Sequence, residues 1–499
     1  MTETELPPVV RGELQPWTDE NPAGGPALTA FLADLLPVRT GRALVAGPHD
    51  SGVLDLLAQR GTDLTVLVRS VGDAAGLRDR YTVVNGALDG LAAENPSGYD
   101  VIVAADGLDR LLGPDSPALD WVQRADLLRG LAAPGALVVI AVENEFSIIG
   151  LLDRRPAQER HGDDEWRPLH DDPRRPTSPA QIEAVLGPVT HRYARFAAGT
   201  LVESGALRRT RPGFPGARIA LAGIAAEASA TPLLAPVTDA AEAAARAGLL
   251  DAVAPGWLVV LGPAGPVHTA YTASGSADLG TDGWRFGERV VPDAENAETV
   301  LFRLAAAEDV PGFRAYAAKL GELGGGAFLD EIHDFVAVPT GPEIPLAAAW
   351  FRFRDRLVGG HRRHPWPPWT ADGDDLVKTW LAMSGAEPTA EILEAGRALA
   401  GPAQDRTDLR GALAGAAAAE QTIREQAGHI FGLERTMRFR DQQLRTREQQ
   451  LRALRDELRR LKSGRAVRAV SFVGRVTRLR DPKRLAGAVK RRVKAFLLR

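Results

Sequence analysis

The 499-residue sequence contains no cysteine, three methionines and no long hydrophobic run. Without cysteine there are no disulfides, cysteine zinc sites, thiol nucleophiles or cysteine-ligated iron–sulfur clusters. The most apolar stretch, residues 136–142, has the length of a strand and is far shorter than the ~18 residues that cross a membrane. The first residues are acidic and lack the basic and apolar regions of a secretory signal. We therefore expect a cytoplasmic protein.

Charge is distributed unevenly along the chain. Residues 420–499 carry 23 Lys and Arg against 8 Asp and Glu, a net charge of +15, so residues 1–419 carry −19 of the total of −4. An acidic body with a basic C-terminal part predicts that this part meets an anionic partner.

Apolar runs of strand length alternate with helix-like segments over residues 26–225. The runs are almost continuously apolar, as in parallel strands that are buried on both faces. They cover residues 43–47, 64–68, 82–86, 100–105 and 136–142, and the helix-like segments cover 52–60, 74–81 and 118–131. The alternation predicts a doubly wound, Rossmann-like α/β domain.

Outside this domain the pattern changes. Residues 1–25 are rich in proline and acids, which predicts a disordered leader. Residues 226–400 predict a small accessory α+β region, with an antiparallel unit at 256–292. A long helical coiled coil is predicted over 401–463, followed by a basic amphipathic tail at 464–499.

The coiled-coil prediction depends on a heptad repeat. Apolar residues recur at strict sevens, and a second row three residues later is partly polar. The first row is Ile423, Ile430, Met437, Leu444, Leu451 and Leu458; the second is Gln426, Leu433, Arg440, Arg447, Leu454 and Leu461. We expect homo-oligomerisation through residues 420–463. The alternative is one amphipathic helix folded back on the body.

The tail has twelve Lys and Arg against Asp481, with apolar residues between them. Such a segment can lie on an anionic membrane surface, which would make the protein peripheral at the inner membrane face. A solvated basic helix is the alternative. Nucleic acid is disfavoured because no spaced aromatic platform or reading motif is present.

The first strand–turn–helix, A43-L-V-A-G-P-H-D-S-G52, has glycines suited to a tight turn and a close ligand approach. With its surroundings it resembles the class I S-adenosylmethionine-dependent methyltransferases over about residues 26–225. The resemblance implies S-adenosylmethionine as cofactor. The cofactor-binding positions it implies are Gly47, Pro48, His49, Gly52, Arg69, Ser70, Gly86, Ala87, Leu88, Ala105 and Asp106.

Three positions depart from the family pattern. Val45 and His49 stand where the family has an acidic residue and a glycine, and Arg69 stands where an acid binds the ribose. Asp50 or Asp73 would then have to supply the ribose carboxylate.

A second resemblance concerns methyltransferases of actinobacterial cell-surface glycan clusters, some with a C-terminal coiled coil. It rests on VENEFSIIGLLD (142–153), TSPAQIEAVLG (177–187), HPWPPW (364–369) and the Ser-Gly-Arg break at 463–465. It implies a glycan or small-molecule acceptor. Glu143, His161 and His170 are the candidate catalytic groups, since an imidazole or carboxylate can act as general base. The plainer interpretation is solvated, ion-paired side chains. No metal-ligand spacing is present.

Two functions follow from these patterns. The first is O-methylation of a cell-surface glycan or its precursor. The second is a catalytically inactive methyltransferase-fold scaffold that organises glycan-assembly enzymes through its coiled coil and tail.

Overall fold

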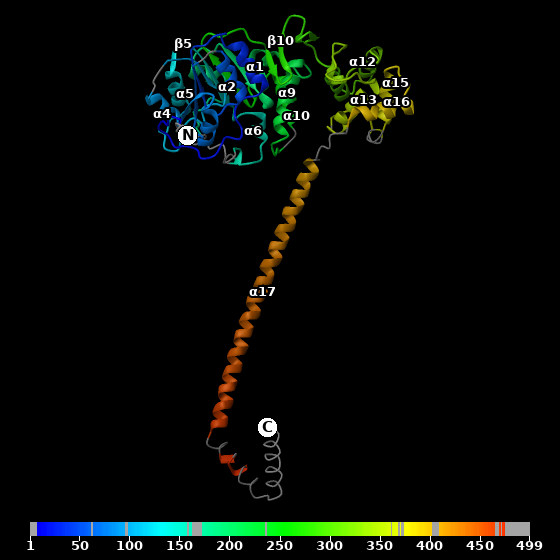
Figure 1. Ribbon diagram of the computed structural model, residues 1–499. Coiled ribbons are helices and arrows are strands. Elements are labelled where there is room, and N and C mark those ends of the chain that lie inside the picture. The colour runs from blue at the N-terminus through cyan, green and yellow to red at the C-terminus, as the bar shows by residue number, and fades with distance from the viewer. Residues whose placement is uncertain are drawn as a thin grey trace, which may run out of the picture. The chain divides into compact units, whose positions relative to one another are not determined.

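The computed structural model divides into two compact units, residues 1–406 and 407–499 (Figure 1). The structure describes residues 7–60, 63–94, 98–156, 159–161, 172–234, 237–360, 362–367, 370, 374–401, 409–464, 469–470 and 472–474.

Five parallel strands form one side of a twelve-stranded sheet in the first unit, in the order β3-β2-β1-β4-β5. They are β1 (Arg42–Ala46), β2 (Asp63–Val68), β3 (Thr82–Asn85), β4 (Tyr99–Ala104) and β5 (Ala132–Glu143). Each lies on one of the predicted apolar runs. Both faces are buried, because Leu44 and Ala46 belong to one hydrophobic cluster and Ala43 and Val45 to another. The order reverses between β1 and β4, as in a Rossmann-like sheet.

Helices follow β1, β2, β3 and β4. Three of them lie near the predicted helical segments: α2 (Ser51–Gln59), α3 (Val71–Leu77) and α5 (Trp121–Gly130). The fourth, α4 (Leu88–Glu94), was not predicted. The expectation of an α/β, Rossmann-like domain is therefore met.

The other seven strands of the sheet pair antiparallel. β8 (Gly256–Leu261) lies between β5 and β6 (His191–Arg195) and is antiparallel to both. The sheet continues through β7 (Leu201–Glu203), β9 (Ala270–Thr272), β10 (Gly275–Leu279), β11 (Trp284–Phe286) and β12 (Arg289–Val291). The strands expected at 256–292 are antiparallel, but they extend the same sheet. The boundary drawn at residue 225 therefore does not separate two sheets; it falls within α9 (Pro215–Ala228).

Further helices pack beside the sheet and beyond it. They are α1 (Pro26–Leu35), α6 (Ile148–Leu152), α7 (Pro179–Leu186), α8 (Ser204–Arg209) and α10 (Val237–Ala247). A third hydrophobic cluster is helical and belongs to α11 (Ala297–Ala306), α12 (Val310–Glu322), α13 (Leu346–Val358), α15 (Asp375–Met383) and α16 (Ala390–Ala400), with the short strands β13 (Ile332–His333) and β14 (Val336–Ala337) nearby.

Trp366, in the aromatic–proline segment, contributes to this helical cluster. The Trp366 ring lies 5.0 Å from Phe313 and 5.2 Å from Trp380, centroid to centroid. Trp366 therefore packs against helices. Trp369 lies outside the described residues.

Residues 7–25 are packed against the sheet, although a disordered leader was expected. β-Bridges join Val9 to Asn85, Gln15 to Ser70 and Ala23 to His49. Val10, Gln15 and Ala23 are buried. The expectation is wrong for residues 7–25, because backbone pairing and buried side chains hold them in place.

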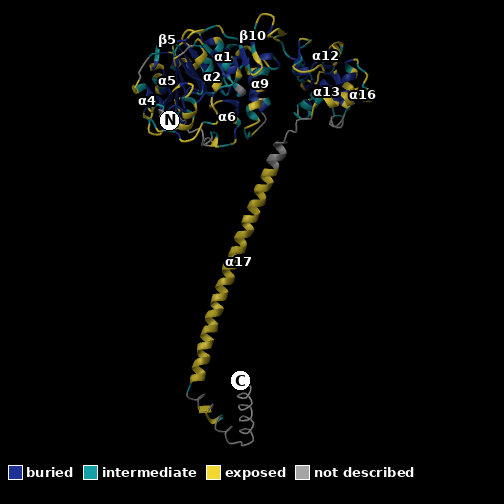
Figure 2. Cartoon of the chain, viewed as in Figure 1, coloured by how far each residue is buried: buried dark blue, intermediate teal, exposed yellow. Residues whose placement is uncertain are grey.

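The second unit contains α17 (Leu409–Ser463), 55 residues long. Its side chains are exposed from residue 415 to residue 462 (Figure 2). No helix in the described part of the chain is long and apolar enough to span a bilayer. Most of the predicted tail, 464–499, lies outside the described residues.

Candidate functional site

The turn after β1 is built around a buried histidine. Gly47 takes φ +90°, a conformation that favours glycine, and its N–H donates to the Leu67 carbonyl at 2.9 Å. The Ala105 N–H donates to Nε2 of His49 at 3.1 Å, so Nδ1 carries the proton and donates to the Gly47 carbonyl at 3.0 Å. Burial lowers the pKa of His49, and the ring is neutral. His49 thus joins the β1 turn to the end of β4.

The N-terminal segment, residues 8–25, crosses the carboxyl ends of β3, β2 and β1 in that order. In a doubly wound sheet this is where a nucleotide-like ligand binds. Backbone hydrogen bonds of 2.9–3.0 Å join Val10 N to Asn85 O, Asn85 N to Pro8 O, Gln15 N to Arg69 O, Val71 N to Gln15 O, Ala23 N to Pro48 O and Asp50 N to Ala23 O. The segment therefore forms hydrogen bonds with the backbone N–H and carbonyl groups at the strand ends, where a ligand would otherwise bind.

Two glycines permit this close approach. A Cβ on Gly86 would lie 2.6 Å from the Val10 carbonyl oxygen, and one on Gly90 would lie 2.1 Å from that of Arg11. Real Cβ atoms do not come so near to backbone oxygen. Glycine at 86 and 90 is therefore explained by the docked segment.

The carboxylates that were candidates for ribose binding contact the segment instead. Asp50 accepts from the N–H of Val53 at 2.9 Å, which caps α2, and from the N–H of Gly25 at 2.7 Å. Asp73 accepts from the N–H of Asp19 at 3.0 Å. Both carboxylates therefore hold the segment in place.

Arg69 is buried beneath the same segment. Burial lowers its pKa to about 10, while the nearby carboxylates of Asp19, Glu13 and Asp115 act in the opposite direction. Arg69 therefore remains a cation at neutral pH. Two of those three acids belong to the segment, so the residue that departs from the family pattern is complementary in charge to the chain that covers it.

The remaining implied positions have local structural roles. The Ser70 hydroxyl caps α3 by accepting from the Asp73 N–H at 3.0 Å. Gly86 N donates to Val68 O, Ala87 N to Arg11 O and Leu88 N to Leu111 O. While the segment is docked, these residues do not fit S-adenosylmethionine.

A cavity of about 650 Å³ lies beside the covered crevice, at the carboxyl ends of β4 and β5. Of the eleven positions implied for the cofactor, only Ala105 and Asp106 line it. Its other walls come from the ends of β6, β8 and α9 and from residues 21–24 of the N-terminal segment. Its charged lining residues are Asp106, Asp109, Arg110, Glu143, Arg195 and Glu227.

Arg110 connects this cavity to the N-terminal segment. Its guanidinium donates to Asp106 at 2.8 Å, to Asp19 at 3.2 Å and to the Asn21 carbonyl at 2.9 Å. All three charged side chains are largely buried. The acid at the end of β4 is therefore neutralised by an arginine that also holds the segment.

Glu227 is an ionisable group of the cavity whose titration is strongly perturbed. Burial raises its pKa to about 7; the Glu143 carboxylate adds to the rise and Arg195 opposes it. Arg195 donates to the Ala105 carbonyl at 3.0 Å. A carboxyl that titrates near neutrality can accept or donate a proton at physiological pH.

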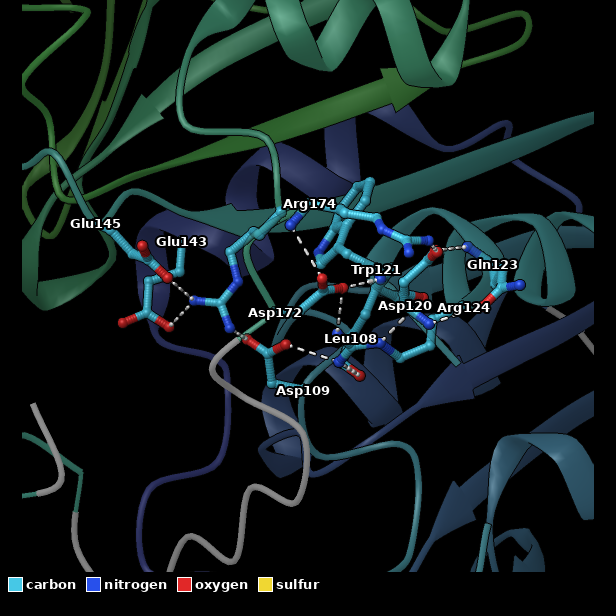
Figure 3. Close-up of polar contacts among 11 residues, drawn as sticks. Leu108, Asp109, Asp120, Trp121, Gln123, Arg124, Glu143, Glu145, Asp172 and Arg174 are labelled. Atoms are coloured by element: carbon cyan, nitrogen blue, oxygen red, sulfur yellow. Dashed lines mark hydrogen bonds and ion pairs between the residues drawn. The ribbon is translucent and has the colours of Figure 1, made fainter. Parts of the chain in front are cut away.

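One wall of the cavity is held by an ion-pair network (Figure 3). Arg175 lies 3.0 Å from Asp109, 3.7 Å from Glu143 and 3.4 Å from Glu145. Asp109 also accepts from Arg124, which is fully buried, at 2.9 Å. The network fixes Asp109 and Glu143 at the cavity.

The structure brings together two of the three predicted catalytic groups. His161 Nε2 lies 3.5 Å from Glu143 Oε1, and Glu143 lines the cavity. His170 lies outside the described residues. Arg195 and Glu227 were not predicted, because β6 and α9 carry no motif and reach the cavity only through the fold. Among the described residues there is no group of three or more His, Asp or Glu that could hold a metal ion.

Comparison with known proteins finds no matching family model and no curated relative. Among solved structures, the CcbJ methyltransferase from Streptomyces caelestis is similar at 21% sequence identity with a TM-score of 0.19. The match covers 26% of this chain and 55% of that chain, so it spans about half of the CcbJ length. A methyltransferase is thus a weak structural neighbour.

Proposed function

We propose that the first unit is a catalytically inactive, methyltransferase-like binding module that takes a small hydroxyl-rich ligand, such as a sugar unit of a glycan, in the cavity beside β4 and β5. The observation that carries this proposal is the backbone pairing of residues 8–25 with the ends of β1, β2 and β3. In this closed state the segment pairs with the strand ends at which the resemblance places the methyl donor.

The lining of the cavity supports the ligand class. Carboxylates of Glu143 and Glu227 accept hydrogen bonds from hydroxyl groups, and the Arg195 guanidinium donates them. A volume of about 650 Å³ lies within the ~300–1,000 Å³ of small-molecule sites. Acceptors and a donor around a polar cavity suit a sugar better than an apolar ligand.

A second candidate, methyl transfer to a hydroxyl, is favoured by Glu227. Its pKa of about 7 suits a general base for a hydroxyl proton. This function would require residues 8–25 to leave the crevice. The two candidates therefore differ in whether opening the segment creates a binding site for S-adenosylmethionine.

Calorimetry on the full chain separates them. Wild type and Gly90→Ala, which disfavours docking of the segment, are titrated with S-adenosylmethionine and its demethylated product. Gly76→Ala in α3 is the matched control, because a Cβ there meets nothing within 4 Å. No heat with any of the three supports the inactive module. Micromolar binding to Gly90→Ala or wild type supports the methyltransferase.

The ligand class is tested separately with methyl hexosides at millimolar concentration. We expect binding to wild type and at least about tenfold weaker binding to Glu227→Gln and Arg195→Met. Glu322→Gln, an exposed change on α12, is the control. Equal affinities in all four proteins would contradict the assignment of the cavity.

A further inference from the structure

The long helix of the second unit carries a stripe of exposed apolar side chains. With Ile423 as heptad position a, the a column is apolar over six heptads, and position d is leucine in three of them. These nine side chains are 51–64% exposed. A helix that is stable in water normally buries such a stripe against a partner.

We propose that α17 pairs with α17 of a second copy of this chain as a parallel, in-register two-stranded coiled coil. The inference is independent of the proposed function. It rests on the charges beside the stripe, which distinguish orientation and register.

The two arginines in the d column are each followed by an acid at position e. Arg440 precedes Asp441, and Arg447 precedes Glu448. In a parallel, in-register pair, a d side chain packs beside d and e of the facing helix. Each arginine would therefore meet an acid of the partner helix. Of the three layers with leucine at d, two have a basic residue at e and one has Glu434. Both arginine layers therefore carry an acid at e, against one of the three leucine layers.

The flanking g and e positions also suit the parallel arrangement. Each g residue faces the e residue five positions further along the other helix. These pairs are His429–Glu434, Thr436–Asp441, Gln443–Glu448, Gln450–Arg455 and Glu457–Lys462. None places like charges together, and the last is an ion pair of opposite charges.

An antiparallel pair that uses all six heptads is less favourable. It places Met437 opposite Arg447 and Leu444 opposite Arg440. Its e positions then face one another, which brings acids from the group Glu434, Asp441 and Glu448 together near the centre. Like charges at this edge destabilise the pair.

Two strands fit better than three. The heptad of Ile430 and Leu433 has a β-branched residue at a and leucine at d, a combination that favours dimers. The arginines at d can reach solvent in a two-stranded coil, whereas a third helix would enclose them. Polar residues at a few core positions lower stability but fix the register.

Cysteine cross-linking tests the orientation directly, because the native chain has no cysteine. In the parallel dimer the two copies of residue 437 face each other, and Met437→Cys forms a disulfide-linked dimer on mild oxidation. In the antiparallel register the two copies of residue 437 are ten residues, about 15 Å, apart along the axis. Gln442→Cys, at the outward position f, is the matched control and does not cross-link in either arrangement.

Sedimentation equilibrium of the full chain gives the second readout. We expect the mass of a dimer for wild type. Leu444→Asp buries a charge in the stripe, so its dimer dissociation constant should be at least about 100-fold higher. Asp441→Lys removes the partner of Arg440 and weakens the dimer about tenfold. Asp456→Lys makes the same charge change at position f, where it loses only an exposed ion pair with Arg459 within its own helix, and it changes the affinity by less than about twofold.

Each contrary result overturns a stated part of the proposal. A monomer that does not cross-link at Met437→Cys refutes pairing. A trimer refutes two strands. A disulfide between differently tagged Met437→Cys and Arg447→Cys chains, without one between two Met437→Cys chains, refutes the parallel orientation. Equal effects of Asp441→Lys and Asp456→Lys refute the role of the arginine–acid pairs.

Discussion

The close contact between Gly90 and the N-terminal segment can be tested with a single methyl group. Gly90 lies in α4, and a Cβ there would come within 2.1 Å of the carbonyl oxygen of Arg11 and 2.7 Å of its nitrogen. Both atoms belong to backbone, so a rotamer change cannot relieve the contact. Alanine also stabilises a helix interior by about 1 kcal/mol relative to glycine. Gly90→Ala therefore favours α4 and disfavours docking of the segment.

The magnitude follows from the hydrogen bonds that hold the segment near this point. Val10 N to Asn85 O, Asn85 N to Pro8 O and Ala87 N to Arg11 O are made only when the segment is docked. At about 1 kcal/mol net for each, they contribute about 3 kcal/mol. A substitution that prevents them should raise the open population about 100-fold, since 1.4 kcal/mol corresponds to a factor of ten.

Hydrogen exchange measured by mass spectrometry reports this opening. We expect the amides of Val10, Asn85 and Ala87 to exchange about 100-fold faster in Gly90→Ala than in wild type. Amides in the middle of β5, residues 138–140, pair with β4 and β8 and not with the segment, so they serve as the internal reference and should not change. Gly76→Ala, where the added methyl group meets nothing within 4 Å, should leave all of these rates as they are in wild type.

Slow exchange at Val10 and Asn85 in Gly90→Ala would refute the docked position of residues 8–13. Equal increases in melting temperature for Gly90→Ala and Gly76→Ala would also contradict the docked position. They would show that the methyl group at residue 90 does not contact the backbone of Arg11. The proposal of a closed crevice would fall with it.

Three further outcomes follow from buried charge. Burial lowers the pKa of His49 below 6.5, so the unfolded chain takes up the proton at a higher pH than the folded protein does. The free energy of unfolding should therefore decrease as the pH falls below about 6.5, by up to about 1.4 kcal/mol per pH unit. His49→Gln should show a shallower slope in urea titrations, and an unchanged slope would contradict this. Burial raises the pKa of Glu227 to about 7, so the folded protein loses stability as this carboxyl ionises between about pH 4.5 and 7. The free energy of unfolding of Glu227→Gln should therefore exceed that of wild type by on the order of 2 kcal/mol at pH 8 and equal it at pH 4.5. Arg175→Met leaves the Asp109 and Glu143 carboxylates without a shared cation and should cost about 3 kcal/mol in chemical denaturation, against under about 1 kcal/mol for Glu145→Gln.

Local pattern alone determined the central elements. The five parallel strands lie on apolar runs because strands buried on both faces are apolar throughout, and this property is readable within five or six residues. The long helix was equally readable, since a seven-residue repeat over six heptads is a property of the sequence itself. The tight turn at Gly47 followed from the placement of glycine after a strand.

Tertiary structure decided what these elements do together. Sequence did not indicate that β8 lies between β5 and β6, because pairing between distant strands leaves no local signal. Nor did it indicate that residues 7–25 are ordered: proline and acids predict disorder unless a distant surface supplies partners, as the ends of β1, β2 and β3 and the buried Arg69 do here. The pKa of Glu227 likewise depends on burial and on Glu143, which is 84 residues away along the chain. Charge and burial act through space, and only the fold sets those distances.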